Sequence, residues 1–191
     1  MAAEISSIET ATPETWVRPT ELPDYSQVDI SNEEVLYLTY DTQLVKLASN
    51  FVSFYIAGTA TVIEWGTLSN GVFTSAGSTT LASGGTYRAT LPTNLGKYIV
   101  YRIKPSGASH ITRYYLGTSN ITIASQRINA VKQPLIEVYC RLPYINNLSG
   151  PLTATNTISF THYGAISPTS MASAFSNSYS IEHIFFESLN T

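Results

Sequence analysis

The stretch FVSFYIAGTATVIEWG, residues 51–66, decides the fold class. It holds two runs of β-branched and aromatic residues, which are typical of β-strands, on either side of Gly58. Glycine readily adopts the positive φ that a tight reversal needs, so the stretch predicts a β-hairpin that turns at Gly58. We therefore expect a mainly β protein organised around these two strands.

The composition limits the classes to which the protein can belong. Its 191 residues are enough for one or two modest domains with cores of their own. Only 12% of the residues are charged, and a formal net charge of −3 offers no basic surface to nucleic acid. No run of about 18 apolar residues is present, so we expect no insertion into a membrane. The N-terminus also lacks the basic and apolar segments of a secretory signal.

Residues 1–34 predict an extended arm, because prolines interrupt a polar stretch that has neither strand nor helix periodicity. A tryptophan in such an arm needs a surface to cover its large apolar ring. Two alternatives are open: the ring packs on its own domain, or it anchors the arm on another subunit. The candidate anchoring residues are Trp16, Val17, Arg18, Pro19 and Tyr25.

Residues 35–107 predict a small antiparallel β-sandwich with five or six short strands. Runs at residues 35–40, 86–91 and 97–103 are rich in β-branched and aromatic residues. Residues 66–85 consist mostly of Gly, Ser, Thr and Ala, which supply flexibility without a core. We expect a long loop or weak edge strands there.

Two segments of this region resemble a known family. IEWG at residues 63–66 and GKYIV at residues 96–100 are similar to the paired signature of PKD-like, immunoglobulin-type domains. In that family a strand ending in an acidic residue, an aromatic residue and Gly-Asp-Gly faces a later Gly-x-Tyr-x-Val strand. The resemblance implies an Ig-like sandwich. The chain departs from the pattern at Thr67 and Leu68, where the family has Asp-Gly.

The tetrapeptide WVRP at residues 16–19, placed ahead of such a domain, resembles the N-terminal arm of bacteriophage tail fibres and related virion proteins. That resemblance implies a structural virion protein, a tail or capsid appendage assembled in the host cytoplasm. Residues 1–34 would attach it to other virion proteins. The C-terminal part would face outward for host attachment.

Residues 108–191 contain three short β-prone segments that echo one another. Their central residues Ile136, Ile158 and Ile181 are 22 and 23 positions apart, a period typical of leucine-rich repeats, in which each unit adds one strand to a parallel ladder. Ala174 and Phe175 resemble the Met-Phe position of BspA-like repeats. The alternative is a set of unrelated strands in a second sandwich. A repeat array ending here would expose an apolar edge, so we expect further chain or a partner to cover it.

No set of residues predicts catalysis, a cofactor or a metal. His110, His162 and His183 lack the spacing of metal ligands, and the chain has no Gly-x-Ser-x-Gly elbow. Cys140 lies in an apolar run and is expected to be buried and inert. We therefore expect a non-enzymatic protein that acts by binding.

The C-terminal tyrosines are candidates for an outward recognition surface, because Tyr combines apolar area with a polar tip. Burial in a β core is the alternative. Such a surface would recognise a host glycan or protein, and virion appendages are expected to be homo-oligomers. Two other functions stay open: a carbohydrate-binding or adhesion module of a bacterial surface protein, and a depolymerase, for which we find no paired carboxylates. The candidate residues are Tyr139, Tyr144, Tyr163 and Tyr179.

Overall fold

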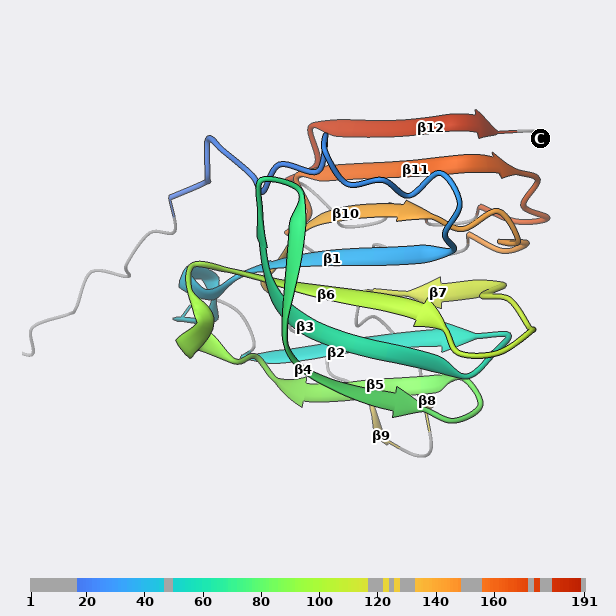
Figure 1. Cartoon of the computed structure of the whole chain (residues 1–191), viewed down its shortest axis with the longest axis horizontal. Coiled ribbons are helices and arrows are strands. Elements are labelled where there is room, and N and C mark those ends of the chain that lie inside the picture. The colour runs from blue at the N-terminus through green and yellow to red at the C-terminus, as the bar shows by residue number, and fades with distance from the viewer. Residues whose placement is uncertain are drawn as a thin grey trace, which may run out of the picture.

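A computed structural model describes residues 17–46, 50–116, 122–123, 126–127, 133–148, 156–171, 174–175 and 180–189. Its regular structure consists of strands and two short 3-10 helices (Figure 1). The elements are β1 (Val35–Asp41), η1 (Thr42–Lys46), β2 (Phe51–Ala57), β3 (Thr61–Ser69), β4 (Val72–Leu81), β5 (Gly85–Thr90), η2 (Thr93–Leu95), β6 (Tyr98–Pro105), β7 (Arg113–Tyr115), β8 (Thr122–Ile123), β9 (Gln126–Arg127), β10 (Leu135–Arg141), β11 (Ser159–Ile166) and β12 (His183–Leu189).

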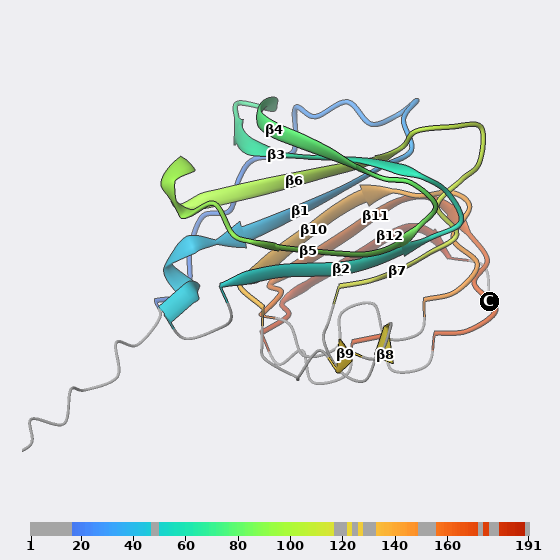
Figure 2. The same ribbon diagram turned by 90° about the horizontal axis from the view of Figure 1, so that it is seen from below.

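The strands form two sheets that pack against each other (Figure 2). The larger sheet has the order β12-β11-β10-β1-β6-β3-β4, the smaller one has the order β5-β2-β7, and β8 pairs with β9. Apolar residues on the facing sides fill the space between the sheets. Phe54 of β2, for example, lies against Tyr101 of β6 with their ring centroids 6.3 Å apart. The predicted mainly β fold with two packed sheets is confirmed.

The hairpin predicted for residues 51–66 is wrong. Its two segments are strands, β2 and β3, but β2 belongs to the smaller sheet and β3 to the larger one. Val52, Phe54 and Ile56 on β2 and Ile63 on β3 all point into the shared core. Crossing from one sheet to the other lets both strands bury their apolar faces against each other, which pairing within one sheet would not.

The hairpin of this region lies one strand further along, between β3 and β4. Asn70 and Gly71 form its two-residue turn, with φ values of 50° and 74°, and Ser69 pairs with Val72. Two positive φ angles define the turn that fits the twist of paired strands, and Asn-Gly is its preferred sequence. Of the two alternatives for residues 66–85, a long loop or weak edge strands, the second is confirmed, because β4 is an edge strand of the larger sheet.

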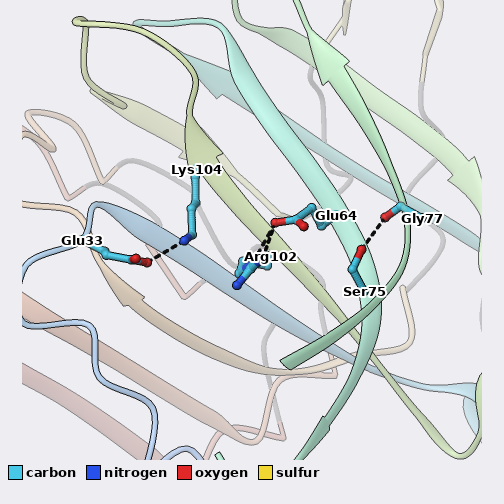
Figure 3. Close-up of polar contacts among 6 residues, drawn as sticks. All are labelled: Glu33, Glu64, Ser75, Gly77, Arg102 and Lys104. Atoms are coloured by element: carbon cyan, nitrogen blue, oxygen red, sulfur yellow. Dashed lines mark hydrogen bonds and ion pairs between the residues drawn. The ribbon is translucent and has the colours of Figure 1, made fainter. Parts of the chain in front are cut away.

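The two segments that carry the PKD-like resemblance lie on adjacent antiparallel strands. Glu64 of β3 pairs with Arg102 of β6, and their side chains form an ion pair with a 2.6 Å contact (Figure 3). The Arg102 guanidinium also lies 4.5 Å from the centre of the Phe73 ring. Lys104, two residues along β6, pairs with Glu33 at 2.6 Å. Side chains from three segments thus link the outer face of these strands to residues just before β1.

β10, β11 and β12 are adjacent parallel strands of the larger sheet. Glu137, Ser159 and His183 align across them, at intervals of 22 and 24 residues. The parallel pairing predicted from the three similar segments is confirmed, but the spacing from β11 to β12 is one residue longer than the predicted 23, so Ile181 is not equivalent to Ile158. The interpretation as leucine-rich repeats stays a prediction. β10 pairs with β1, so strands from residues 35–107 and 108–191 share one sheet and one core.

β1 is buried on both faces. Leu36 and Leu38 point into the core between the sheets, whereas Val35 and Tyr37 point to the outer face. Residues 17–34, which contain no strand or helix, run across that outer face before they enter β1 (Figure 1). The arm thus acts as a third layer over the centre of the sheet.

Candidate functional site

Tyr25 packs the arm onto the outer face of the larger sheet. Its ring stacks on Tyr139 of β10, with the ring centroids 4.6 Å apart, and its hydroxyl shares a 2.8 Å hydrogen bond with the Thr39 hydroxyl. Only 5% of Tyr25 is exposed. The ring of Tyr25, a candidate for anchoring the arm, is thus covered by the chain's own sheet.

A carboxyl group is buried beneath this contact. Glu137 of β10 is nearly inaccessible, and its Oε2 accepts a long, 3.5 Å hydrogen bond from the Thr39 hydroxyl. Burial raises the pKa of Glu137 to about 8, because the charged form loses its hydration. Glu137 is therefore protonated and neutral at pH 7. This protonation explains how an acidic side chain is tolerated under the arm.

Aromatic rings continue from Tyr139 across the three parallel strands. Tyr139 meets Tyr163 of β11, and Tyr163 meets Phe185 of β12, each with ring centroids 5.5 Å apart. Burial raises the pKa of Tyr139 to about 12, so it is a neutral phenol at every physiological pH. Exposure increases outward, and Phe185 on β12 is 46% exposed. Of the predicted recognition tyrosines, Tyr139 and Tyr163 thus lie side by side, with Tyr139 partly under the arm.

A bulge in β11 interrupts the ladder beside Tyr163. The register between β11 and β12 shifts between His162 and Ala165, and Gly164 has a φ of 87°. The Gly164 N–H donates a 2.7 Å hydrogen bond to Oε2 of Glu187 instead of to a strand carbonyl. Bulges bend a strand and redirect its side chains, and they recur beside binding sites.

A groove of about 540 Å³ opens between the arm and this bulge. That volume is within the range of small-molecule sites. Among the described residues the Arg141 side chain makes no hydrogen bond or ion pair, whereas its backbone pairs with Val35 of β1 and Tyr163 of β11. The groove is lined by Val28, Asp29, Ile30 and Ser31 of the arm and by Tyr139, Arg141, Tyr163, Gly164, Ala165 and Glu187 of the sheet.

The acidic residues of the groove are held by hydrogen bonds. The backbone N–H and the hydroxyl of Ser31 both donate to Oδ1 of Asp29, and these bonds lower the pKa of Asp29. Glu187 uses Oε2 for the Gly164 N–H. Each carboxylate keeps a second oxygen that can accept a hydrogen bond from a ligand. The groove thus combines phenol rings, a guanidinium and two carboxylates.

β12 forms one edge of the larger sheet. Ile184 is 49% and Phe185 46% exposed, which is unusual for large apolar side chains on a strand. An edge strand presents unpaired backbone groups to any further strand. The combination makes this edge a second candidate for contact with a partner.

The other residues predicted for anchoring or recognition are scattered. Val17 is exposed, whereas Arg18 forms a 3.1 Å ion pair with Glu182 and donates to the Ser180 carbonyl. Pro19 is half-buried. Tyr144 is half-exposed and stacks on His110, away from the groove residues. Trp16 and Tyr179 lie outside the described residues.

His162 and Cys140 are buried on the inner side of the parallel strands. Burial lowers the pKa of His162 to about 4 and raises that of the Cys140 thiol, so both are uncharged at pH 7. In the part of the chain that the structure describes, no three His, Cys, Asp or Glu side chains gather as a metal site. None of the helices in the described segments has the length and apolar character to cross a membrane.

The sequence predicted two tyrosines of the groove but missed its charged residues. Asp29, Arg141 and Glu187 come from three separate segments, and no local pattern connects them. The one available signal for these residues was the similarity of the three β-prone segments around Ile136, Ile158 and Ile181. In a parallel ladder such segments align, so outward-facing residues of successive strands lie side by side. Aligning Ile136 with Ile158 would have placed Arg141 next to Tyr163, as the structure does.

Comparison of the chain with known protein-family models, with curated proteins and with solved structures finds no match in any of the three.

Proposed function

We propose that the protein is a non-enzymatic structural component of a bacteriophage virion, a tail or capsid appendage that acts by association. The support from sequence is the resemblance of residues 16–19 to virion arms and of β3 and β6 to PKD-like, Ig-like domains. The spacing of β10 to β12 supports a leucine-rich-repeat-type region. The observation that carries the proposal is the pair of exposed apolar side chains, Ile184 and Phe185, on β12, which is an edge strand within the described part of the chain and is suited to assembly.

The order of residues along β12 favours a second copy of the chain as the partner. Two β12 strands that pair antiparallel about Phe185 bring His183 opposite Glu187 of the second copy, twice. Phe185 then lies opposite its own counterpart. Aromatic pairs stabilise neighbouring strands, and an imidazole N–H can donate a hydrogen bond to a carboxylate. A twofold contact of this kind joins the two larger sheets into one and leaves neither β12 edge open.

Sedimentation analysis of the purified chain tests this association. We expect a dimer, and we expect Ile184→Lys to yield a monomer with an unchanged melting temperature, because the lysine lies at an exposed position. Val72→Lys is the matched control, since Val72 is 65% exposed on β4 at the opposite edge of the same sheet. A wild-type monomer at every concentration, or a dimer lost only in Val72→Lys, contradicts association through β12.

Mass spectrometry of purified phage particles tests the virion assignment itself. The proposal expects peptides of this chain in particles at a fixed ratio to the major structural proteins. Their absence from particles of a phage that expresses the chain refutes it.

The groove favours a second candidate, a carbohydrate-binding or adhesion module of a bacterial surface protein. A virion appendage and an adhesion module would both attach to a surface, so they are told apart by where the protein is found. Recovery of the chain from bacterial envelopes in uninfected cells supports the adhesion module.

A further inference from the structure

We infer that the groove between the N-terminal arm and β10 to β12 binds a neutral saccharide. The inference deepens the proposed function, because it rests on a role in attachment and names the site and the ligand class. Four features of the groove carry it: its shape, its aromatic wall, the remaining hydrogen-bonding capacity of its charged groups and its balance of charge.

The aromatic wall suits the apolar face of a sugar ring. Tyr139 and Tyr163 stand edge to face, with an interplanar angle of 62°. In such a pair the edge of one ring meets the face of the other, which holds both rings of the wall in place. A pyranose has a flat, C–H-lined face, which packs on such a ring by dispersion and by excluding water.

The charged groups suit hydroxyl pairs at the rim of the same sugar. A guanidinium donates through two parallel N–H groups, and a carboxylate accepts through two oxygens, so each can serve two neighbouring hydroxyls. The Arg141 side chain makes no hydrogen bond or ion pair among the described residues, and Asp29 and Glu187 each have a second carboxylate oxygen that can accept. These groups lie on both sides of the groove, one on the arm and two on the sheet.

The balance of charge selects a neutral ligand. Two carboxylates outnumber one guanidinium in the lining, so an acidic sugar or a phosphate meets net repulsion. A cationic peptide is the competing ligand for a groove with carboxylates and phenol rings. Arg141 opposes it, because this cationic side chain lines the same groove and forms no ion pair with the described residues.

The bulge at Gly164 gives the site its form. It places Tyr163 and Gly164 opposite the single residue Glu187, and the backbone N–H of Gly164 fixes that carboxylate. A regular strand has no such recess, because its side chains alternate in register. The rigid sheet supplies most of the lining, so the site is largely formed before a ligand arrives.

The test uses the full chain on an array of neutral hexose and N-acetylhexosamine oligosaccharides, with sialylated glycans and a lysine-rich peptide as comparison probes. We expect saturable binding of at least one neutral oligosaccharide. Arg141→Lys and Asp29→Asn should each weaken it by roughly tenfold, since each loses hydrogen bonds to a charged group. Both substitutions are close in size to the original residue, and their melting temperatures report whether the fold is intact.

Tyr144→Phe and Tyr163→Ala form the matched pair for the aromatic wall. Tyr144 lies outside the groove, so we expect unchanged binding, whereas Tyr163→Ala should abolish it. Saturation-transfer NMR with irradiation of the tyrosine rings gives a second readout in the wild-type chain, namely transfer to the sugar C–H protons. This readout needs no substitution.

Several results overturn the inference. They are no neutral glycan bound by the folded chain, binding that survives both Arg141→Lys and Tyr163→Ala, or preference for the sialylated glycans or the lysine-rich peptide. If the chain is found in particles but binds no glycan, the groove inference fails and the virion proposal stands. If the chain binds neutral glycans but is absent from particles, the groove inference stands and the virion proposal fails.

Discussion

Replacing Glu137 by Gln should make the protein more stable at neutral and alkaline pH. Glu137 is buried under the arm, and its pKa of about 8 compares with an ordinary value of 4.5. Glutamine has the same shape but never ionises. The substitution therefore removes the requirement that the fold keep a proton on this side chain.

The sign and size follow from proton linkage. Between pH 4.5 and about 8 the folded state holds the Glu137 proton while the unfolded state has released it, so the free energy of unfolding falls as pH rises. Each pH unit removes about 1.4 kcal/mol. The loss is about 3 kcal/mol at pH 7, and it approaches about 5 kcal/mol above pH 8.

Urea unfolding followed by tryptophan fluorescence measures this effect. The difference in unfolding free energy between Glu137→Gln and the wild type should grow by about 3 kcal/mol from about pH 5 to about pH 8. Glu182→Gln is the control, since Glu182 is an exposed carboxylate whose ion pair with Arg18 contributes little. Parallel pH curves for wild type and Glu137→Gln would refute the reasoning, because they would mean that Glu137 ionises alike in the folded and unfolded states.

Three further substitutions test other parts of the structure. The pKa of His162 is about 4 in the folded state and 6.5 ordinarily, so on acidification the unfolded state gains a proton first. The wild type should therefore lose about 3 kcal/mol of unfolding free energy between these pH values, and His162→Phe should not. Thermal melts between these pH values check it, and equal acid sensitivity in both proteins contradicts it. Gly164→Ala should lower the free energy of unfolding by about 1–2 kcal/mol, because its φ of 87° is strained for alanine. Ala165→Gly is the control. An unchanged free energy of unfolding in urea for Gly164→Ala argues against the bulge. Tyr25→Phe should lower the free energy of unfolding by about 1 kcal/mol, because it removes the hydrogen bond to Thr39. It should also speed amide hydrogen exchange in residues 17–34, and unchanged exchange there contradicts the role of Tyr25 in holding the arm.

The strands were predictable where local patterns suffice. Alternating β-branched and aromatic residues marked β1, β5 and β6, and the echo of Ile136, Ile158 and Ile181 marked the parallel ladder. The pairing of β2 was not predictable in the same way, because a strand's sequence does not state which sheet it joins. The polar composition of β4 left a loop and a weak edge strand as equal alternatives, although Asn70-Gly71 is the preferred sequence for a hairpin turn.

The candidate groove was predictable only in its aromatic half. Tyr139 and Tyr163 stand out by composition, whereas Asp29 and Glu187 are ordinary surface residues until the arm folds back. The arm itself was expected to be extended, and nothing in its sequence fixed its path across the sheet. Tyr25 decides that path through its contacts with Thr39 and Tyr139, which are long-range in sequence.

The position of β1 at the centre of the larger sheet has a consequence for how the protein folds. β1 pairs on one side with β6 and on the other with β10, and Thr39 meets Glu137, which is 98 residues later. A ribosome must therefore release most of the chain before the central strand has both neighbours. Contacts so distant in sequence slow folding and leave strand edges open in the meantime. Tyr25 of the arm contacts Tyr37 of β1 and Tyr139 of β10, so closure of the arm reports the pairing of these two distant strands.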